Sequence, residues 1–301
     1  MFKTLRRQRR LRDTQAESLR LRQQILSAQL TLEAIKTRRS GVGNAKPHDI
    51  VVSLTTFDKR IGNVYLTIES LMQQSLKPDR IVLCVSEADV TESNLPEILH
   101  LQKSRGLEVL FCERDLGPYK KFFHTFQKYP DSLIITADDD LMYPFDFVDM
   151  LYRAWLARPD VIHAHRAHRM LCDATGGVLP YKSWEKSTDL AEPSALVFPT
   201  GNGGVLYFPG AFDEEVLNEQ QFMALCPASD DIWLKAMSLK NGTLCQRIQD
   251  PREFGTRFVV IPESQTHALK RSNKSKVDGN DDKLKAVLDA YELWPRLTQR
   301  P

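Results

Sequence analysis

The sequence lacks the cysteine patterns of a disulfide scaffold or a zinc site. It contains no Cys-x-x-Cys pair, and none of its cysteines is grouped with histidines at zinc-binding spacing. The cysteines are odd in number and widely spaced: Cys84, Cys112, Cys172, Cys226 and Cys245. Reduced thiols in a cytosolic protein are the simplest interpretation of this usage.

Long apolar runs are also missing. Nowhere do eighteen apolar residues follow one another, so the sequence predicts no membrane span. The N-terminus is basic but lacks the apolar stretch of a signal peptide, and we therefore expect a cytoplasmic protein, either free or peripheral on the inner face of the membrane. The net charge of +2 requires no nucleic-acid partner.

Proline and glycine are absent from about residue 5 to residue 39, which predicts one long helix in a basic N-terminal segment, residues 1–44. Its apolar and small residues recur at alternating spacings of three and four, the pattern of a coiled-coil seam: Leu11, Thr14, Ser18, Leu21, Ile25, Ala28, Leu32 and Ile35. One interpretation is a homo-oligomer formed through this helix, and another is attachment of its basic start to an anionic membrane. A solvated helix packed on its own body is the alternative.

Strand and helix patterns alternate after the linker at residues 40–47. The expected strands are residues 50–56, 80–86, 107–111 and 133–136, and the expected helices between them are residues 61–74, 96–103 and 119–129. This alternation predicts an α/β fold with a mostly parallel sheet flanked by helices. We expect this domain to cover residues 48–262, followed by a C-terminal loop and helix in residues 263–301.

Three consecutive aspartates, Asp138, Asp139 and Asp140, follow the fourth expected strand directly. Carboxylates so close together repel one another, and a hard divalent cation such as Mg²⁺ relieves that repulsion. A solvated acidic turn before the next helix is the alternative interpretation.

Polar residues also follow the other expected strands: Ser53, Thr55, Thr56, Glu87 and Asp115. In a parallel sheet the carboxyl ends of the strands meet at one edge, where ligands bind. The sequence therefore predicts a binding crevice that these side chains share with the aspartates.

These motifs resemble those of nucleotide-sugar-dependent glycosyltransferases of the GT-A fold, closest to the family-2-like bacterial enzymes. The resemblance covers roughly residues 49–261. Residues 136–144 (TADDDLMYP) resemble the Asp-x-Asp element of that family, residues 50–56 resemble its first strand, and residues 61–79 resemble the helix and turn that follow. Ser53-Leu54-Thr55-Thr56 departs from the commoner Pro-x-Tyr-Asn of the family, so the resemblance does not extend to the details of base recognition.

The resemblance implies roles for single residues on the donor side. Asp138 would face the ribose or base, and Asp139 and Asp140 would hold a divalent metal, Mn²⁺ or Mg²⁺, at the diphosphate. Asp115 would help to hold the nucleoside. For Lys120 a phosphate contact and a plain helix-surface position are equally good interpretations. Some GT-A enzymes supply a late histidine to the metal, which here would be His267.

Residues 226–235 (CPASDDIWLK) resemble the Glu-Asp element that opens a helix near the acceptor in this family. An inverting transfer needs a carboxylate that removes the proton of the acceptor hydroxyl. The resemblance assigns Asp231 to this role and Asp230 to its acidic neighbour. The alternative is that Ser229 or Asp230 only caps the helix.

Three further segments are rich in potential ligand-binding residues. Gly203 and Gly204 lie in a glycine-rich stretch that permits close approach of a ligand to the backbone, or simply forms a turn. Residues 163–169 (HAHRAHR) fit an anion site or a strand with one solvated face. Trp184 fits either a sugar-stacking side chain or a buried one.

The combined prediction is a metal-dependent, inverting glycosyltransferase that moves a sugar from a nucleotide-diphosphate sugar to a saccharide or lipid-linked acceptor. Bacterial capsule or lipopolysaccharide synthesis follows by resemblance only. A nucleotidylyltransferase is an alternative, although residues 55–60 contain none of the glycines that its loop needs. A non-catalytic scaffold of a polysaccharide assembly is the third class.

Overall fold

The computed structural model describes residues 2–43, 46–173, 176–262, 264 and 279–298. His267 lies outside the described residues, as does most of the polar stretch 270–282. The helices of the described residues, in chain order, are α1 (Phe2–Lys36), α2 (Val64–Met72), α3 (Glu97–Lys103), α4 (Lys120–Lys128), α5 (Phe147–Ala157), α6 (Glu219–Leu225), α7 (Asp230–Asn241), α8 (Phe254–Arg257), α9 (Asn280–Ala290) and α10 (Trp294–Thr298). The strands are β1 (Ile50–Thr55), β2 (Arg80–Ser86), β3 (Leu107–Cys112), β4 (Leu133–Ala137), β5 (Leu141–Met142), β6 (Ile162–Ala164), β7 (Ala167–Arg169), β8 (Val197–Pro199), β9 (Val205–Tyr207), β10 (Cys245–Arg247) and β11 (Val259–Val260).

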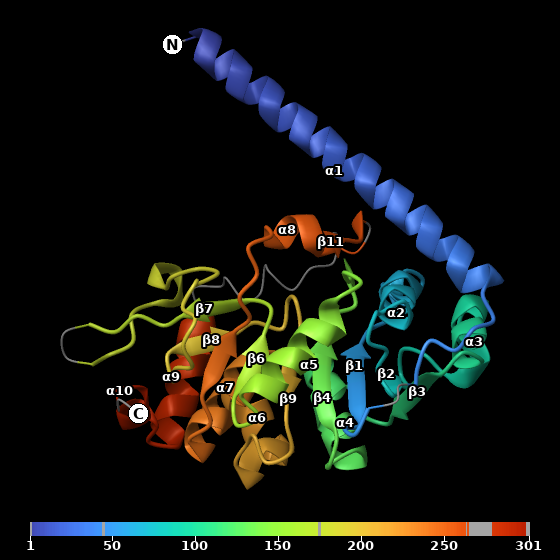
Figure 1. Cartoon of the computed structure of the whole chain (residues 1–301). Coiled ribbons are helices and arrows are strands. Elements are labelled where there is room, and N and C mark those ends of the chain that lie inside the picture. Colours follow the sequence, from blue (N-terminus) through green and yellow to red (C-terminus); the bar gives the residue numbers. More distant parts are fainter. Residues whose placement is uncertain (1, 44–45, 174–175, 263, 265–278, 299–301) are drawn as a thin grey trace.

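A seven-stranded sheet in the order β10-β6-β9-β4-β1-β2-β3 forms the centre of the molecule (Figure 1). Strands β1 to β4 pair in parallel, and β9 runs antiparallel between β4 and β6. The predicted α/β fold, with a mostly parallel sheet flanked by helices and a long helix before it, is therefore confirmed. The four predicted strands agree with β1 to β4 to within one residue at either end.

Both faces of the parallel sheet are covered because alternate residues of each strand point to opposite sides. Ile50, Val52 and Leu54 pack in one apolar cluster with residues of α2, α3 and α5. Val51 lies in a second cluster on the other face, which α4 covers. The carboxyl ends of β1 and β4 are consequently held side by side between two helical layers.

Helix α1 has two different parts. Its C-terminal part packs against the body through Leu30 and Ala34, which are 2% and 0% exposed, and Leu30 contacts Leu66 of α2. Residues 13–22 are exposed throughout, and Figure 1 shows this end of α1 (dark blue) extending away from the sheet. None of the helices in the described residues is both long and apolar enough to cross a membrane.

The chain between α1 and β1 is tied to the body where it is described. The Gly41 backbone N–H donates to the Arg105 carbonyl at 2.9 Å, and the side chain of Met72 leaves no room for a Cβ at Gly41. This part of the expected linker therefore continues the packing of α1 onto α2 and α3.

Candidate active site

A buried lysine joins two aspartates, Asp138 and Asp230, at the edge where β1 and β4 end. Lys121, in the first turn of α4, places Nζ 3.0 Å from Oδ1 of Asp138 and 3.0 Å from Oδ2 of Asp230. Burial alone would lower the pKa of Lys121, but the charges of Asp138, Asp230 and Asp231 outweigh it and raise the pKa well above its usual value. The lysine is therefore charged, and it links a residue after β4 to the start of α7.

Strand β1 holds the backbone of Lys121 in place through Ser53. Ser53, fully buried in β1, donates to the Lys121 carbonyl, and its hydroxyl lies 2.7 Å from Oγ1 of Thr125. Tyr119 stacks on Phe222 and donates to the Cys226 carbonyl at 2.6 Å, which ties the start of α4 to the loop before α7. The predicted donor-binding Ser53 thus lies inside the molecule and contacts the helix that carries the lysine.

Asp231 occupies the partly buried end of this network. The Gly201 backbone N–H donates to both carboxylate oxygens of Asp231, each at 3.0 Å. Burial and the neighbouring charge of Asp230 raise the pKa of Asp231 to about 7, although Lys121 and the Gly201 N–H act in the opposite direction. Burial also raises the pKa of Asp230, which Lys121 opposes. A carboxylate with a pKa near 7 is suited to accept a proton at neutral pH.

Helix capping does not account for this pair of aspartates. Ser229 is the residue that precedes α7, and its side chain makes no capping hydrogen bond. Its hydroxyl instead accepts a hydrogen bond from Lys283 of α9 at 3.1 Å. The two carboxylates in the first turn of α7 are directed at Lys121 and Gly201 rather than only at their own helix.

A second cation lies on the other side of the aspartate run. Asp139 is 7% exposed and accepts hydrogen bonds from Thr56, at 2.7 Å, and from the Arg60 guanidinium. The same guanidinium lies 3.6 Å from Asp140 and donates to the Ser264 carbonyl at 3.0 Å. Burial raises the pKa of Asp139, and the charge of Arg60 opposes this rise. The repulsion expected in the acidic run is thus relieved by two protein cations, Lys121 and Arg60.

The donor set at the end of β4 fits a divalent cation of the Mg²⁺ type, which takes one or two carboxylates and completes its shell with water and phosphate oxygens. Asp140 has the side chain best placed for this, because it is 21% exposed whereas Asp139 is nearly enclosed by Thr56 and Arg60. In the part of the chain that the structure describes, no three histidine, cysteine or acidic side chains group as a metal site. A cation bound at Asp140 would therefore take further ligands from the oxygens of the substrate.

The remaining strand ends line the same edge farther along the sheet. The Thr55 hydroxyl donates to the Cys84 carbonyl at 2.7 Å, and Glu87 is exposed just beyond β2. Asp115 is exposed after β3, where it accepts a hydrogen bond from the Gly117 N–H at 2.9 Å and forms an ion pair with Lys120. Burial would raise the pKa of Asp115, but these two contacts lower it. The structure places Lys120 on Asp115, with only 3% of the lysine side chain exposed.

Two glycines proposed for ligand contact instead permit tight packing. Gly203 and Gly204 have φ angles of +107° and +89°. An added Cβ would lie 2.7 Å from the Phe254 ring at Gly203 and 2.4 Å from the Phe147 ring at Gly204. Both positions therefore require glycine for backbone and packing reasons. Gly201 is the glycine that borders the charged network, where a Cβ would lie 3.0 Å from Asp231 Oδ1 and 3.4 Å from Lys121 Nζ.

The histidine-rich segment forms neither a solvated strand face nor an anion site built from imidazoles. His163, His165 and His168 are 1%, 4% and 2% exposed. Burial lowers the pKa of all three, to about 4 for His165 and His168, so the imidazoles are neutral. The expectation of one solvated face was wrong because residues 162–164 and 167–169 belong to different sheets. Trp184 is also buried, against Phe198 and Tyr181.

Lys121, Arg60 and Gly201 were not among the predicted site residues. Lys121 had one available signal: with Thr125 it lies at helical spacing i, i+4, on the face of the expected helix that meets the sheet. Arg60 and Gly201 lie in loops, and no periodic pattern distinguishes them from their neighbours. Their contacts depend on how distant segments meet in space.

No protein-family model matches the chain, and no curated protein sequence matches it either. Among solved structures, residues 1–349 of S. aureus TarS match with a TM-score of 0.48 and 12% identity over 80% of this chain and 70% of that chain. The same protein in complex with UDP gives a TM-score of 0.46 and 14% identity over 67% of this chain and 58% of that one.

A third solved structure is glucosyl-3-phosphoglycerate synthase from Mycobacterium tuberculosis, in complex with Mn²⁺, UDP and glucosyl-3-phosphoglycerate. It gives a TM-score of 0.31 and 14% identity over 39% of this chain and 43% of that chain. The chain thus spans 58% and 43% of the lengths of the two ligand-bound neighbours. Because these TM-scores lie below 0.5, we base the functional proposal on the side chains of this chain.

Proposed function

We propose that this protein transfers a sugar from a nucleotide-diphosphate sugar to a hydroxyl group of a saccharide or lipid-linked acceptor. The observation that carries the proposal is the network Asp138–Lys121–Asp230, with Asp231 beside it. It joins the acidic end of a parallel strand, where a nucleotide donor would bind, to a carboxylate with a pKa near 7. The sequence resemblance to GT-A glycosyltransferases assigns the same two elements to donor and acceptor.

Asp231 is the proposed base. In the reaction the acceptor O–H gives its proton to the Asp231 carboxylate, and the acceptor oxygen forms a bond to the anomeric carbon. The bond from that carbon to the diphosphate oxygen breaks, and its electron pair leaves with the nucleoside diphosphate. Attack from the side opposite the leaving group inverts the anomeric centre. The two hydrogen bonds from Gly201 orient the carboxylate for this transfer.

Asp230 and Lys121 are proposed to position that base and to balance its charge. Asp230 is buried and bound to Lys121, so it is less accessible to an acceptor than Asp231. Lys121 holds Asp230 and Asp138 at a fixed separation. It thereby fixes the position of Asp231, beside Asp230, relative to the residues proposed to bind the donor. Structure and resemblance therefore support the same assignment, with Asp231 as the base and Asp230 as its neighbour.

On the donor side, Asp138 is proposed to contact the ribose or base, with Thr56, Glu87 and Asp115 along the same edge. Asp140, with Asp139 behind it, would hold Mn²⁺ or Mg²⁺. When bound, the ion would supply positive charge to the diphosphate as it departs. Arg60 donates a hydrogen bond to Asp139 and orients it beside that position. We propose that the protein acts at the inner face of the membrane, in the synthesis of a surface polysaccharide.

A donor screen tests the proposal directly. The full chain is incubated with single nucleotide sugars and Mn²⁺, Mg²⁺ or EDTA, and released nucleoside diphosphate is measured. We expect one donor to be hydrolysed slowly with metal and not with EDTA. Release of pyrophosphate would identify a nucleotidylyltransferase instead, and failure of every nucleotide sugar to bind would leave the scaffold alternative.

The metal role is tested by Asp140→Ala. Donor turnover should fall by roughly 100-fold or more, because the variant lacks the carboxylate that we propose as the main metal ligand. Asp149→Ala is a matched control, since Asp149 has a similar exposed fraction, 25%, and pairs with Arg153 on α5. Unchanged turnover after Asp140→Ala would contradict the metal role and leave the base assignment intact.

A further inference from the structure

Helix α1 carries two apolar stripes, and the body covers one of them. Leu26, Leu30 and Ala34 form the covered stripe, in which Leu26 and Leu30 contact the cluster that includes Leu66 of α2 and Val259 of β11. The second stripe, which we call the seam, is exposed at every position: Thr14, Ser18, Leu21, Ile25, Ala28, Leu32 and Ile35. At 3.6 residues per turn the seam lies about half a turn from the covered stripe, so it faces away from the body.

The large apolar side chains of the seam are unusually open to solvent. Leu21, Ile25, Leu32 and Ile35 are 53%, 67%, 53% and 47% exposed. Each is separated from the next seam residue by three or four positions without a break, which is the narrow stripe of a coiled coil rather than the broad face of a helix that lies on a membrane. The N-terminal part of α1, residues 13–22, is exposed throughout within the described part of the chain. A helix with little tertiary packing is marginally stable in water, so a partner would stabilise this part.

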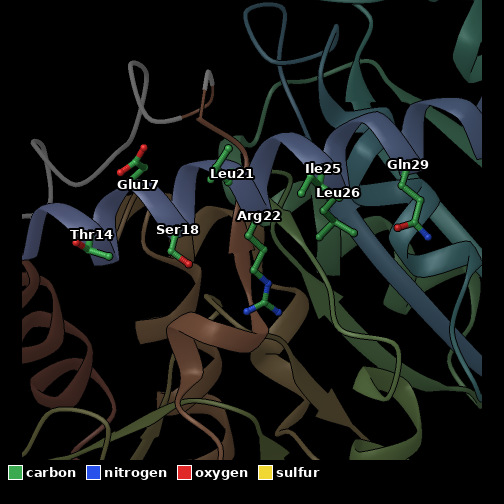
Figure 2. A pocket seen from close by; sticks show the side chains of 8 residues that line it. All are labelled: Thr14, Glu17, Ser18, Leu21, Arg22, Ile25, Leu26 and Gln29. Atoms are coloured by element: carbon green, nitrogen blue, oxygen red, sulfur yellow. The ribbon is translucent and has the colours of Figure 1, made fainter. Parts of the chain in front are cut away.

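Charges beside the seam indicate which partner fits. Figure 2 shows Glu17 and Arg22 pointing to opposite sides of α1, in an open pocket of about 590 Å³ that is also lined by Thr14, Ser18, Leu21, Ile25, Leu26 and Gln29. In a parallel coiled coil, a residue on the flank where Glu17 lies faces the residue five positions later in the sequence of the partner helix. Glu17 then faces Arg22 of the partner subunit, twice by symmetry. The other pairs at this spacing contain at least one neutral residue: Arg10–Gln15, Gln24–Gln29 and Thr31–Lys36.

We propose that α1 pairs with α1 of a second copy of this chain, as a parallel, in-register, two-stranded coiled coil along the seam. An antiparallel pair would bring like flanks together and would not place Glu17 against Arg22. Because the seam faces away from the covered stripe, the two bodies lie on opposite sides of the coil and do not obstruct it. The pairing is independent of the catalytic proposal, since the seam contains none of the site residues.

The molar mass of the full chain in solution is the first test. Sedimentation at 1–50 µM should give twice the chain mass of 34.5 kDa. The double variant Ile25→Asp/Leu32→Asp should sediment as a monomer, because buried aspartates in the seam are unpaired. Leu19→Asp is the matched control: Leu19 is 44% exposed but lies off the seam, and the dimer should persist. Circular dichroism and the melting temperature of the body check that each variant is folded.

Orientation is tested by charge exchange and by cross-linking. Glu17→Arg should weaken dimerisation about tenfold at low salt, and Glu17→Arg/Arg22→Glu should restore it. Ala28→Cys in the seam should form an intermolecular disulfide on mild oxidation. Ala16→Cys, another exposed alanine on the far side of the helix, should not.

Four outcomes would overturn the proposal. A monomeric wild-type chain at 50 µM, or a dimer that survives Ile25→Asp/Leu32→Asp, excludes the seam as the interface. A charge exchange that fails to restore dimerisation excludes the parallel register. A monomer that co-sediments with phosphatidylserine vesicles, and loses this on Ile25→Asp/Leu32→Asp, assigns the seam to a membrane surface instead.

Discussion

Two buried cation–carboxylate groups in this molecule differ in how well their charges match. In the first, Arg105 and Glu69 are 3% and 0% exposed and form two parallel hydrogen bonds, at 2.7 and 3.0 Å, between the end of α3 and α2. Gln102 and Gln73 donate to the same carboxylate, and the Arg39 carbonyl accepts from Arg105. One positive charge meets one negative charge, and both groups are well hydrogen-bonded.

The second group is the Lys121 network, where one ammonium pairs with the carboxylates of Asp138 and Asp230 and lies near a third, that of Asp231. Its geometry is also tight, but its charges do not cancel, and burial together with the charge of Asp230 raises the pKa of Asp231 to about 7. The matched pair joins α2 to the end of α3 and to the chain that follows α1. The unmatched network retains a group that takes up a proton near pH 7. Burial alone therefore does not distinguish a structural ion pair from a candidate site, whereas the charge balance does.

Removal of the proposed base gives the largest expected effect. Asp231→Asn keeps the size of the side chain and one acceptor for the Gly201 N–H, but it cannot take the acceptor proton. We expect kcat for sugar transfer to fall roughly 1000-fold with little change in donor binding. Asp213→Asn, which removes a partly buried aspartate paired with Lys240, serves as the control and should be active. Full activity of the Asp231→Asn variant would remove Asp231 from the chemistry.

The matched pair should affect stability and not activity. Glu69→Gln leaves the Arg105 charge buried without a partner, which we expect to lower the free energy of unfolding by about 3 kcal/mol or more. Turnover per folded molecule should be unchanged. Glu92→Gln, which breaks an exposed pair with Lys103, should cost far less in the same urea titration, because water screens the pair. Equal losses in the two variants would mean that burial does not set the strength of these pairs.

The sequence predicted the regular half of the fold well and the network only in part. Strands β1 to β4 were placed because β-branched runs alternate with helical patterns, and their carboxyl ends gave Asp138 as a candidate. The short strands β6 to β10 carry little periodic signal, so the histidine segment was misread. Lys121 contacts Asp230 across more than 100 residues of chain, and Gly201 contacts Asp231 across about 30 residues through a backbone group. No local pattern encodes such contacts.

The smallest expected effect is a shift in pH dependence, which tests the charge imbalance itself. Asp231 is protonated and inactive as a base below its pKa of about 7, so kcat/KM should fall as pH decreases through that value. After burial, the Asp230 charge is the largest cause of the raised pKa. Asp230→Asn removes that charge and leaves Lys121 to stabilise ionised Asp231, so the acidic limb should move to lower pH by roughly one unit or less. The normalised pH profile measures this even if kcat falls. A limb that stays in place, as expected for Asp213→Asn, or moves to higher pH would show that Asp230 does not set the pKa of the base.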